Sequence, residues 1–183
     1  VPKKFKIIKN NIEFKKNIKV KELKQIDLKN RINILVNKKQ IGSDRVSNAL
    51  AVADKNKSYI LIDFGTATTF DVVKKKNYLG GVIAPGVILS LLNLTNKASL
   101  IPKIKMTKSK KILGKNTSEA VKSGFYWGYI GLINNIIKQI ILKTKTNYKI
   151  IITGGLAHIF KNSLNYKTEI DKELTLKGII KLL

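Results

Sequence analysis

The chain contains no cysteine, which excludes disulfide bonds and thiolate metal sites and fits the reducing cytoplasm. It has no apolar run near the roughly 20 residues that a helix needs to cross a bilayer, so we expect no membrane contact. The basic start at residues 1–5 is not followed by the apolar stretch of a signal peptide. Because position 1 is not methionine, we expect a fragment or a processed form.

Acidic residues and arginines are both scarce. The chain has 36 Lys and Arg residues against 11 Asp and Glu residues, a formal net charge of +25. Only Arg31 and Arg45 are arginines, the side chains best suited to reading bases and phosphates. The lysines are scattered and are not interleaved with aromatic residues that could stack bases. We therefore expect no specific nucleic-acid partner, only salt-sensitive binding to polyanions.

At 183 residues and 44% hydrophobic, the chain can bury one sizeable core or two small lobes. The stretch 3–38 contains three short apolar pieces separated by Lys- and Asn-rich turns. They predict strands at Phe5–Ile8, Ile12–Phe14 and Ile32–Val36. No chemistry is recognisable in this stretch.

The most informative stretch is a short apolar run followed by a polar turn. Residues 59–62 predict a buried strand that ends at Asp63, and Thr69–Val73 predicts a second strand. Between them, Gly65 and threonine hydroxyls can lie close to phosphate oxygens, while the Asp63 carboxylate can hold a cation. An ordinary hairpin with a polar turn is the alternative.

A second polar group precedes an apolar helix pattern at 46–52. In Gly42-Ser43-Asp44-Arg45, a carboxylate near the positive end of a helix is suited to act as a general base, and the guanidinium can bind an anion. The alternative is that Ser43 or Asp44 is only the N-cap of the helix.

Further along, Tyr78–Gly86 predicts a strand end and a flexible corner, with Pro85 in the first turn of a helix that reaches about Thr95. The double glycine, Gly80-Gly81, could serve packing or the approach of a ligand. The apolar face of this helix must lie in the core or in an interface. Residues 95–115 then form a lysine-rich, partly extended connection.

The longest predicted helix runs from Asn116 to about Lys143, with Glu119 completing a capping box. Gly124, Gly128 and Gly131 lie inside it, and each costs roughly 1 kcal/mol against Ala. We expect close approach of another helix as the compensation.

The last part of the chain predicts a strand at Lys149–Ile152, which ends in Thr153-Gly154-Gly155 before a short helix. His158 is the only histidine and is expected to be structural rather than a metal ligand. A final helix is expected at 174–180.

The order and spacing of five motifs over the whole chain resemble the type III pantothenate kinases of the acetate and sugar kinase, Hsp70 and actin superfamily. The motifs are Gly42-Ser43-Asp44-Arg45, Asp63-Phe64-Gly65-Thr66-Ala67-Thr68, Gly80–Gly86, Lys115-Asn116-Thr117 with Ser123-Gly124, and Thr153-Gly154-Gly155-Leu156-Ala157. The resemblance implies an α/β actin-like ATPase (ribonuclease H-like) fold. It also implies a division into the remainder of an N-terminal lobe with the substrate motif, residues 1–55, and a complete C-terminal lobe, residues 56–183.

The resemblance implies ATP-dependent phosphorylation of the 4′-hydroxyl of pantothenate, the first step of coenzyme A synthesis. Asp44 would be the general base, and Gly42, Ser43 and Arg45 would line the pantothenate site with it. Thr117 would also contact pantothenate, and the family works as a homodimer with this site near the subunit interface.

For the nucleotide and the metals, the resemblance implies Mg²⁺ and a monovalent cation, K⁺ or NH₄⁺, held at Asp63. The residues expected to contact ATP are Gly65, Thr66, Thr68, Gly154 and Gly155.

The sequence departs from the family pattern in two places. It contains no Asp-x-Gly-Asn-Thr loop, whose Asp serves Mg²⁺ in the family, so we expect little or no turnover. Leu35 stands where an aromatic contact to pantothenate is usual. Two alternatives stay open: a non-catalytic, partner-binding relative such as a transcriptional accessory factor, and another small-molecule kinase of the superfamily.

Overall fold

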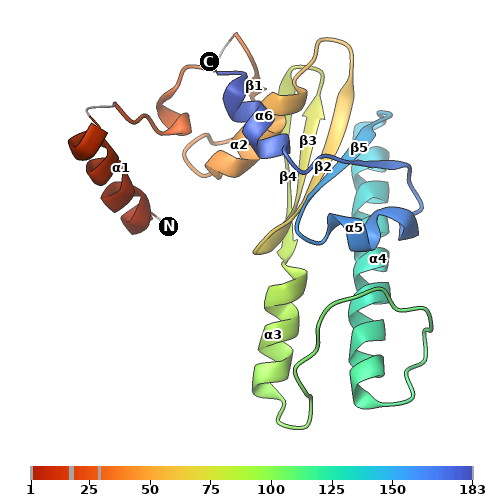
Figure 1. Cartoon of the computed structure of the whole chain (residues 1–183). Helices are drawn as coiled ribbons and strands as arrows, with labels where there is room; N and C mark the ends of the chain where they lie inside the picture. Colours follow the sequence, from red (N-terminus) through yellow and green to blue (C-terminus); the bar gives the residue numbers. More distant parts are fainter. Residues whose placement is uncertain (1, 17–18, 29, 183) are drawn as a thin grey trace.

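The computed structural model describes residues 2–16, 19–28 and 30–182, and its centre is a mixed six-stranded sheet (Figure 1). The strands are β1 (Asn33–Ile34), β2 (Ser58–Phe64), β3 (Ala67–Lys74), β4 (Asn77–Pro85), β5 (Lys149–Gly154) and β6 (Thr168–Ile170). The α-helices are α1 (Pro2–Lys16), α2 (Ser43–Val52), α3 (Val87–Lys97), α4 (Thr117–Thr144), α5 (Ala157–Phe160) and α6 (Leu174–Ile180). Two short 3₁₀ turns are η1 (Leu23–Gln25) and η2 (Lys161–Ser163).

The sheet has the strand order β1-β4-β3-β2-β5-β6. Strands β2, β3 and β4 form an antiparallel meander, while β5 pairs parallel with β2 and β6 pairs parallel with β5. The carboxyl ends of β2 and β5 therefore lie side by side, with Asp63 opposite Thr153 and Phe64 opposite Gly154.

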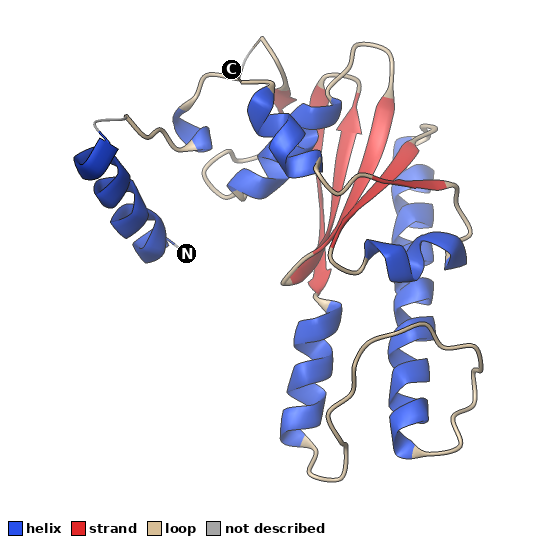
Figure 2. Ribbon diagram, in the orientation of Figure 1, coloured by secondary structure: helices blue, strands red, loops and turns tan. Residues whose placement is uncertain are grey.

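Helices cover both faces of this sheet (Figure 2). Alternate residues of a strand point to opposite faces, and β2 supplies both cores in this way. Ile60, Ile62 and Phe64 pack with α4 and α5, whereas Leu61 packs with α2 and α6. On the first face, the ring of Phe160 stacks on Phe64 at 5.1 Å between centroids.

The predicted strands at 59–62, 69–73 and 149–152 are confirmed, as are the helices beginning near 46, 116 and 174. Asn116 caps α4 by accepting a hydrogen bond from the Glu119 backbone N–H at 2.9 Å. The Glu119 side chain accepts from the Lys115 backbone N–H at 2.9 Å, one residue before the expected partner.

Two of the N-terminal strand predictions are wrong. Phe5–Ile8 and Ile12–Phe14 lie within α1, where Ile8 and Ile12 are four residues apart and share one helix face. Windows of three or four residues were too short to show this period. Of the third predicted strand, Ile32–Val36, only Asn33 and Ile34 pair, as β1.

Two expectations about local backbone are also corrected. Pro85 is the last residue of β4 rather than part of a first helical turn, and α3 begins at Val87 after Gly86. Within the described residues, the glycines of α4 contact no other helix: apart from the nearby backbone of α4 itself, a Cβ added at Gly124, Gly128 or Gly131 would have no atom within 4 Å.

The proposed division at residue 55 stays a prediction. Side chains from both sides of it, among them Leu50 and Leu174, share one core. None of the helices in the described ranges is long and apolar enough to cross a membrane.

Candidate active site

The turn between β2 and β3 places the first predicted group. Gly65 and Thr66 are exposed, and the Gly65 backbone N–H donates to the Ala67 carbonyl at 3.1 Å, which closes the turn. Thr68 lies inside β3, fully buried, and its hydroxyl has no hydrogen-bond partner among the residues described. The turn therefore offers exposed backbone, while Thr68 holds an unused hydroxyl beneath it.

Asp63 lies at the end of β2, enclosed by β5. Gly154 has φ +86°, and a Cβ there would lie 2.7 Å from Asp63 Oδ1 and 2.6 Å from the Phe64 carbonyl oxygen. Only glycine therefore allows the β5 backbone to lie beside this carboxylate. Gly155, the next residue, is exposed with open space around it.

Two residues that sequence analysis missed hold Asp63 from the other side. Asn48 Nδ2 donates to Asp63 Oδ2 at 3.3 Å, and Thr175 Oγ1 donates to Asn48 Oδ1 at 2.7 Å. Burial raises the pKa of the Asp63 carboxyl, the hydrogen bond from Asn48 opposes this rise, and the negative charge of Asp44 adds to it. A carboxylate penalised by burial and by a like charge is a favourable place for a cation.

Asp44 lies in the first turn of α2 and its side chain is exposed. The alternative that Ser43 or Asp44 caps the helix is wrong, because Gly42 is the N-cap and no side chain caps this end. Asp44 and Asn48 are four residues apart and so share one helix face. Asn48 contacts Asp63, and the charge of Asp44 acts on the Asp63 carboxyl. Asp44 and Asp63 therefore lie on the same side of the molecule.

Arg45 faces the sheet rather than solvent. Its Nε donates to Asp71 Oδ1 at 2.8 Å, and its Nη2 lies 2.6 Å from the same oxygen. Tyr78 Oη donates to that oxygen as well, at 2.6 Å. Sequence analysis did not predict a role for Asp71 or Tyr78 in the site. The available signal was a lone carboxylate between Phe70 and Val72 in an apolar strand, where an unpaired charge would be costly.

Thr117 is not brought to this group. It is the first residue of α4, at the end of that helix remote from the sheet and from α2 (Figure 1). Within one copy of the chain, Thr117 therefore lies apart from Asp44 and Asp63.

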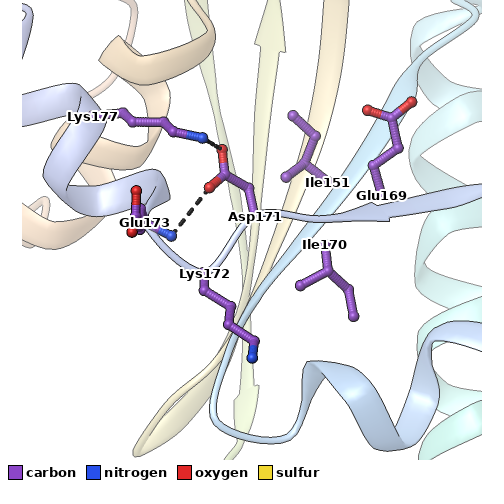
Figure 3. A pocket seen from close by; sticks show the side chains of 7 residues that line it. All are labelled: Ile151, Glu169, Ile170, Asp171, Lys172, Glu173 and Lys177. Atoms are coloured by element: carbon purple, nitrogen blue, oxygen red, sulfur yellow. Dashed lines mark hydrogen bonds and ion pairs between the residues drawn. The ribbon is translucent and has the colours of Figure 1, made fainter.

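His158, on α5, is exposed, and no cluster of three or more His, Cys, Asp or Glu side chains that could hold a metal occurs in the part of the chain described. A cavity of about 300 Å³ lies beside β6, where Asp171 accepts hydrogen bonds from Lys177 Nζ at 2.7 Å and from the Glu173 backbone N–H at 3.1 Å (Figure 3). The Asp171 charge is thus already paired, and this cavity contains none of the predicted site residues.

Solved structures support the fold. A putative Baf family transcriptional activator from Campylobacter jejuni superposes with a TM-score of 0.65 at 20% identity, covering 96% of this chain and 76% of that one. The Alp12 filament structure gives a TM-score of 0.53 at 17% identity, over 75% of this chain and 51% of that one. At these identities the likeness shows the fold alone, the α/β actin-like ATPase fold.

Sequence comparisons give the family. The family model of type III pantothenate kinase matches residues 1–139. The type III pantothenate kinase of Pelagibacter ubique is 54% identical over 183 residues, which cover 99% of this chain and 73% of that protein. The Geotalea daltonii enzyme of the same name is 42% identical over 145 residues, 78% of this chain and 57% of that protein. Through the family match and the Pelagibacter identity, the chain belongs to the type III pantothenate kinase family.

Proposed function

We propose that the chain takes part in ATP-dependent phosphorylation of pantothenate at its 4′-hydroxyl. The observation that carries the proposal is the placement of Asp44 and Asp63 on one side of the molecule, with Asp63 held by Asn48 of the same helix as Asp44, in a member of this family. Phosphoryl transfer needs positioned groups, charge neutralisation and a base for the attacking hydroxyl.

Each residue then has a defined task. Asp44, exposed at the start of α2, accepts the proton of the 4′-hydroxyl. Arg45 binds the pantothenate carboxylate, beside Gly42 and Ser43. Because the transition state of phosphoryl transfer is loose, the proton moves late and the base need not be a strong one.

The turn and the β5 glycines form the nucleotide side. The exposed backbone at Gly65 and Thr66 would contact the phosphates of ATP, and Gly154 and Gly155 would lie near its adenosine. The expectation that Thr68 contacts ATP is wrong, because its side chain is fully buried in β3. A bound monovalent cation would neutralise phosphate charge beside Asp63. The Mg²⁺ that accompanies ATP is assigned no ligand in this chain.

Isothermal titration with pantothenate, followed by mass spectrometry of a reaction containing Mg²⁺-ATP and K⁺, tests the proposal. We expect saturable binding and slow formation of 4′-phosphopantothenate. The absence of both pantothenate binding and product formation would overturn the proposal. The cytoplasmic location expected from the missing cysteines stays a prediction.

A potassium site at Asp63 predicts a cation-dependent stability. At ten times its dissociation constant, a ligand that binds only the folded state adds about 1.4 kcal/mol. KCl should therefore raise the Tm of the chain above its value in choline chloride at equal ionic strength. Asp63→Asn should lose this difference, and Glu169→Gln, which removes an exposed carboxylate of β6, should keep it. An equal response of both variants to K⁺ would contradict the assignment.

The family role of Thr117 calls for a second copy, because Thr117 lies apart from Asp44 within one chain. The surface of α3 and α4 suits such a contact. An apolar groove of about 430 Å³ lies between these helices, lined by residues that include Leu94, Phe125 and Leu132. Leu89 and Leu92 of α3 are also exposed, at 47% and 48%. Exposed apolar patches of this kind mark protein interfaces.

We therefore expect a homodimer in light scattering coupled to size-exclusion chromatography. Leu92→Asp should shift the mass to that of a monomer, because it places a charge in the apolar contact. Leu176→Asp, at a residue of α6 that is 54% exposed, is the matched control and should stay dimeric. Should both variants stay dimeric, the interface lies elsewhere.

A further inference from the structure

The middle of β3 carries a carboxylate with unusual surroundings. Asp71 is completely buried, and its Oδ1 is contacted by Arg45 Nε, Arg45 Nη2 and Tyr78 Oη, while its Oδ2 is buried without a partner among the described residues. Buried ion pairs seldom stabilise a fold more than apolar residues of the same shape would. Stability alone therefore does not account for this pair.

Strand β4 lies close to the same guanidinium. Gly81 lies directly opposite Asp71 in the sheet, and a Cβ at Gly81 would clash with the Phe70 carbonyl oxygen and would lie 2.6 Å from Arg45 Nη2. Tyr78 comes from the same strand, and α2 packs against β3. Asp71, Tyr78 and Gly81 thus surround one edge of the Arg45 guanidinium, and we call these three residues the Arg45 cradle.

The other edge of Arg45 is unused. Its remaining N–H groups have no hydrogen-bond partner in the described part of the chain, and 14% of its side chain is exposed. Burial acts to lower the pKa of Arg45, but the hydrogen bond and the charge of Asp71 together outweigh it and the pKa is raised, so the side chain stays a cation. Asp44 precedes Arg45 in the same helical turn.

We propose that the Arg45 cradle positions the guanidinium so that its unused N–H edge receives the carboxylate of the substrate. This inference rests on the proposed function, since it takes pantothenate as the ligand. Asp71, Tyr78 and Gly81 are positioning residues that act through Arg45 and do not touch the substrate.

The first test examines the cradle without any ligand. Since Arg31 and Arg45 are the only arginines, the NMR spectrum contains two Nε–H signals, and Arg31→Lys identifies them. We expect slow solvent exchange at Arg45 in the unsubstituted chain and fast exchange in Asp71→Asn. Fast exchange at Arg45 in the unsubstituted chain would overturn the cradle itself.

The second test separates positioning from general structural support. Calorimetry compares pantothenate with panthenol, the analogue whose carboxylate is replaced by an alcohol. Asp71→Asn should weaken pantothenate binding at least about tenfold, because an aligned charge-assisted contact is lost. It should leave panthenol binding unchanged. Tyr78→Phe should cause a smaller loss with the same selectivity and is the second variant if Asp71→Asn does not fold.

An equal loss for both ligands, or no loss for either, would overturn the proposal. Glu169→Gln is the control and should bind both ligands as the unsubstituted chain does. If the unsubstituted chain binds neither ligand, the proposed function fails, while the exchange of the Arg45 Nε–H still decides whether the cradle exists.

Discussion

Asp44→Asn is expected to lower the rate of 4′-phosphopantothenate formation by about 10²- to 10⁴-fold, the usual contribution of a general base. Asparagine keeps the shape of the side chain but cannot accept the proton of the attacking hydroxyl. Asp44 is exposed and no side chain caps this end of α2, so the free energy of unfolding should change by only about 0.5 kcal/mol. Product is measured by mass spectrometry.

The control for this substitution is Glu169→Gln, which removes an exposed carboxylate outside the candidate site. It should leave the rate unchanged. Pantothenate affinity, measured by calorimetry on both variants, separates loss of the base from loss of binding. Product formation by Asp44→Asn at the rate of the unsubstituted chain would exclude Asp44 as the base.

Arg45→Ala is expected to destabilise the chain by about 3–5 kcal/mol near neutral pH, because it leaves the buried Asp71 carboxylate with Tyr78 alone. Burial already raises the pKa of Asp71, and Arg45 is the main group that opposes this rise. The folded variant should therefore bind a proton more readily than the unfolded chain does. Its stability is lost as the pH rises through the folded pKa and returns as the pH falls towards the unfolded value, near 3.9.

Urea unfolding in neutral and in mildly acidic buffer measures this effect. The double variant Arg45→Ala, Asp71→Asn should recover part of the lost stability at neutral pH, because no charge is then buried. Equal unfolding midpoints for Arg45→Ala and the unsubstituted chain at neutral pH would show that the pair contributes nothing to the fold.

Local patterns predicted much of this molecule. The strand at 59–62 and the long helix after Asn116 are read correctly because their apolar residues repeat with the period of the element and their ends carry turn or cap residues. The strand predictions near Ile8 and Ile12 are wrong because a run of three or four residues fits the period of a strand and that of a helix equally well. The prediction that Pro85 lies in the first turn of a helix is wrong because strand β4 continues through Pro85, further than the glycine-rich corner indicated.

The surroundings of the site could not be predicted in the same way. Asn48 and Thr175 are 127 residues apart in the sequence, and only the packing of α2 on α6 brings them together. The same holds for Arg45 and Asp71, which are 26 residues apart. The candidate residues Asp44 and Asp63 were named because motifs are local, whereas the groups that orient them depend on the tertiary fold.

The packing of α6 on α2 also bears on when the site can form during synthesis. Gly178 lies directly against the Ser47 carbonyl oxygen, where no larger residue fits, and Ser47 Oγ donates to the Thr175 carbonyl at 2.6 Å. Helix α6 comes after every other described element in the chain. On the ribosome, α2 is therefore made well before α6, and Asp44 and Asn48 reach their final places only after α6 has been made. Until then its apolar face is open to chaperones.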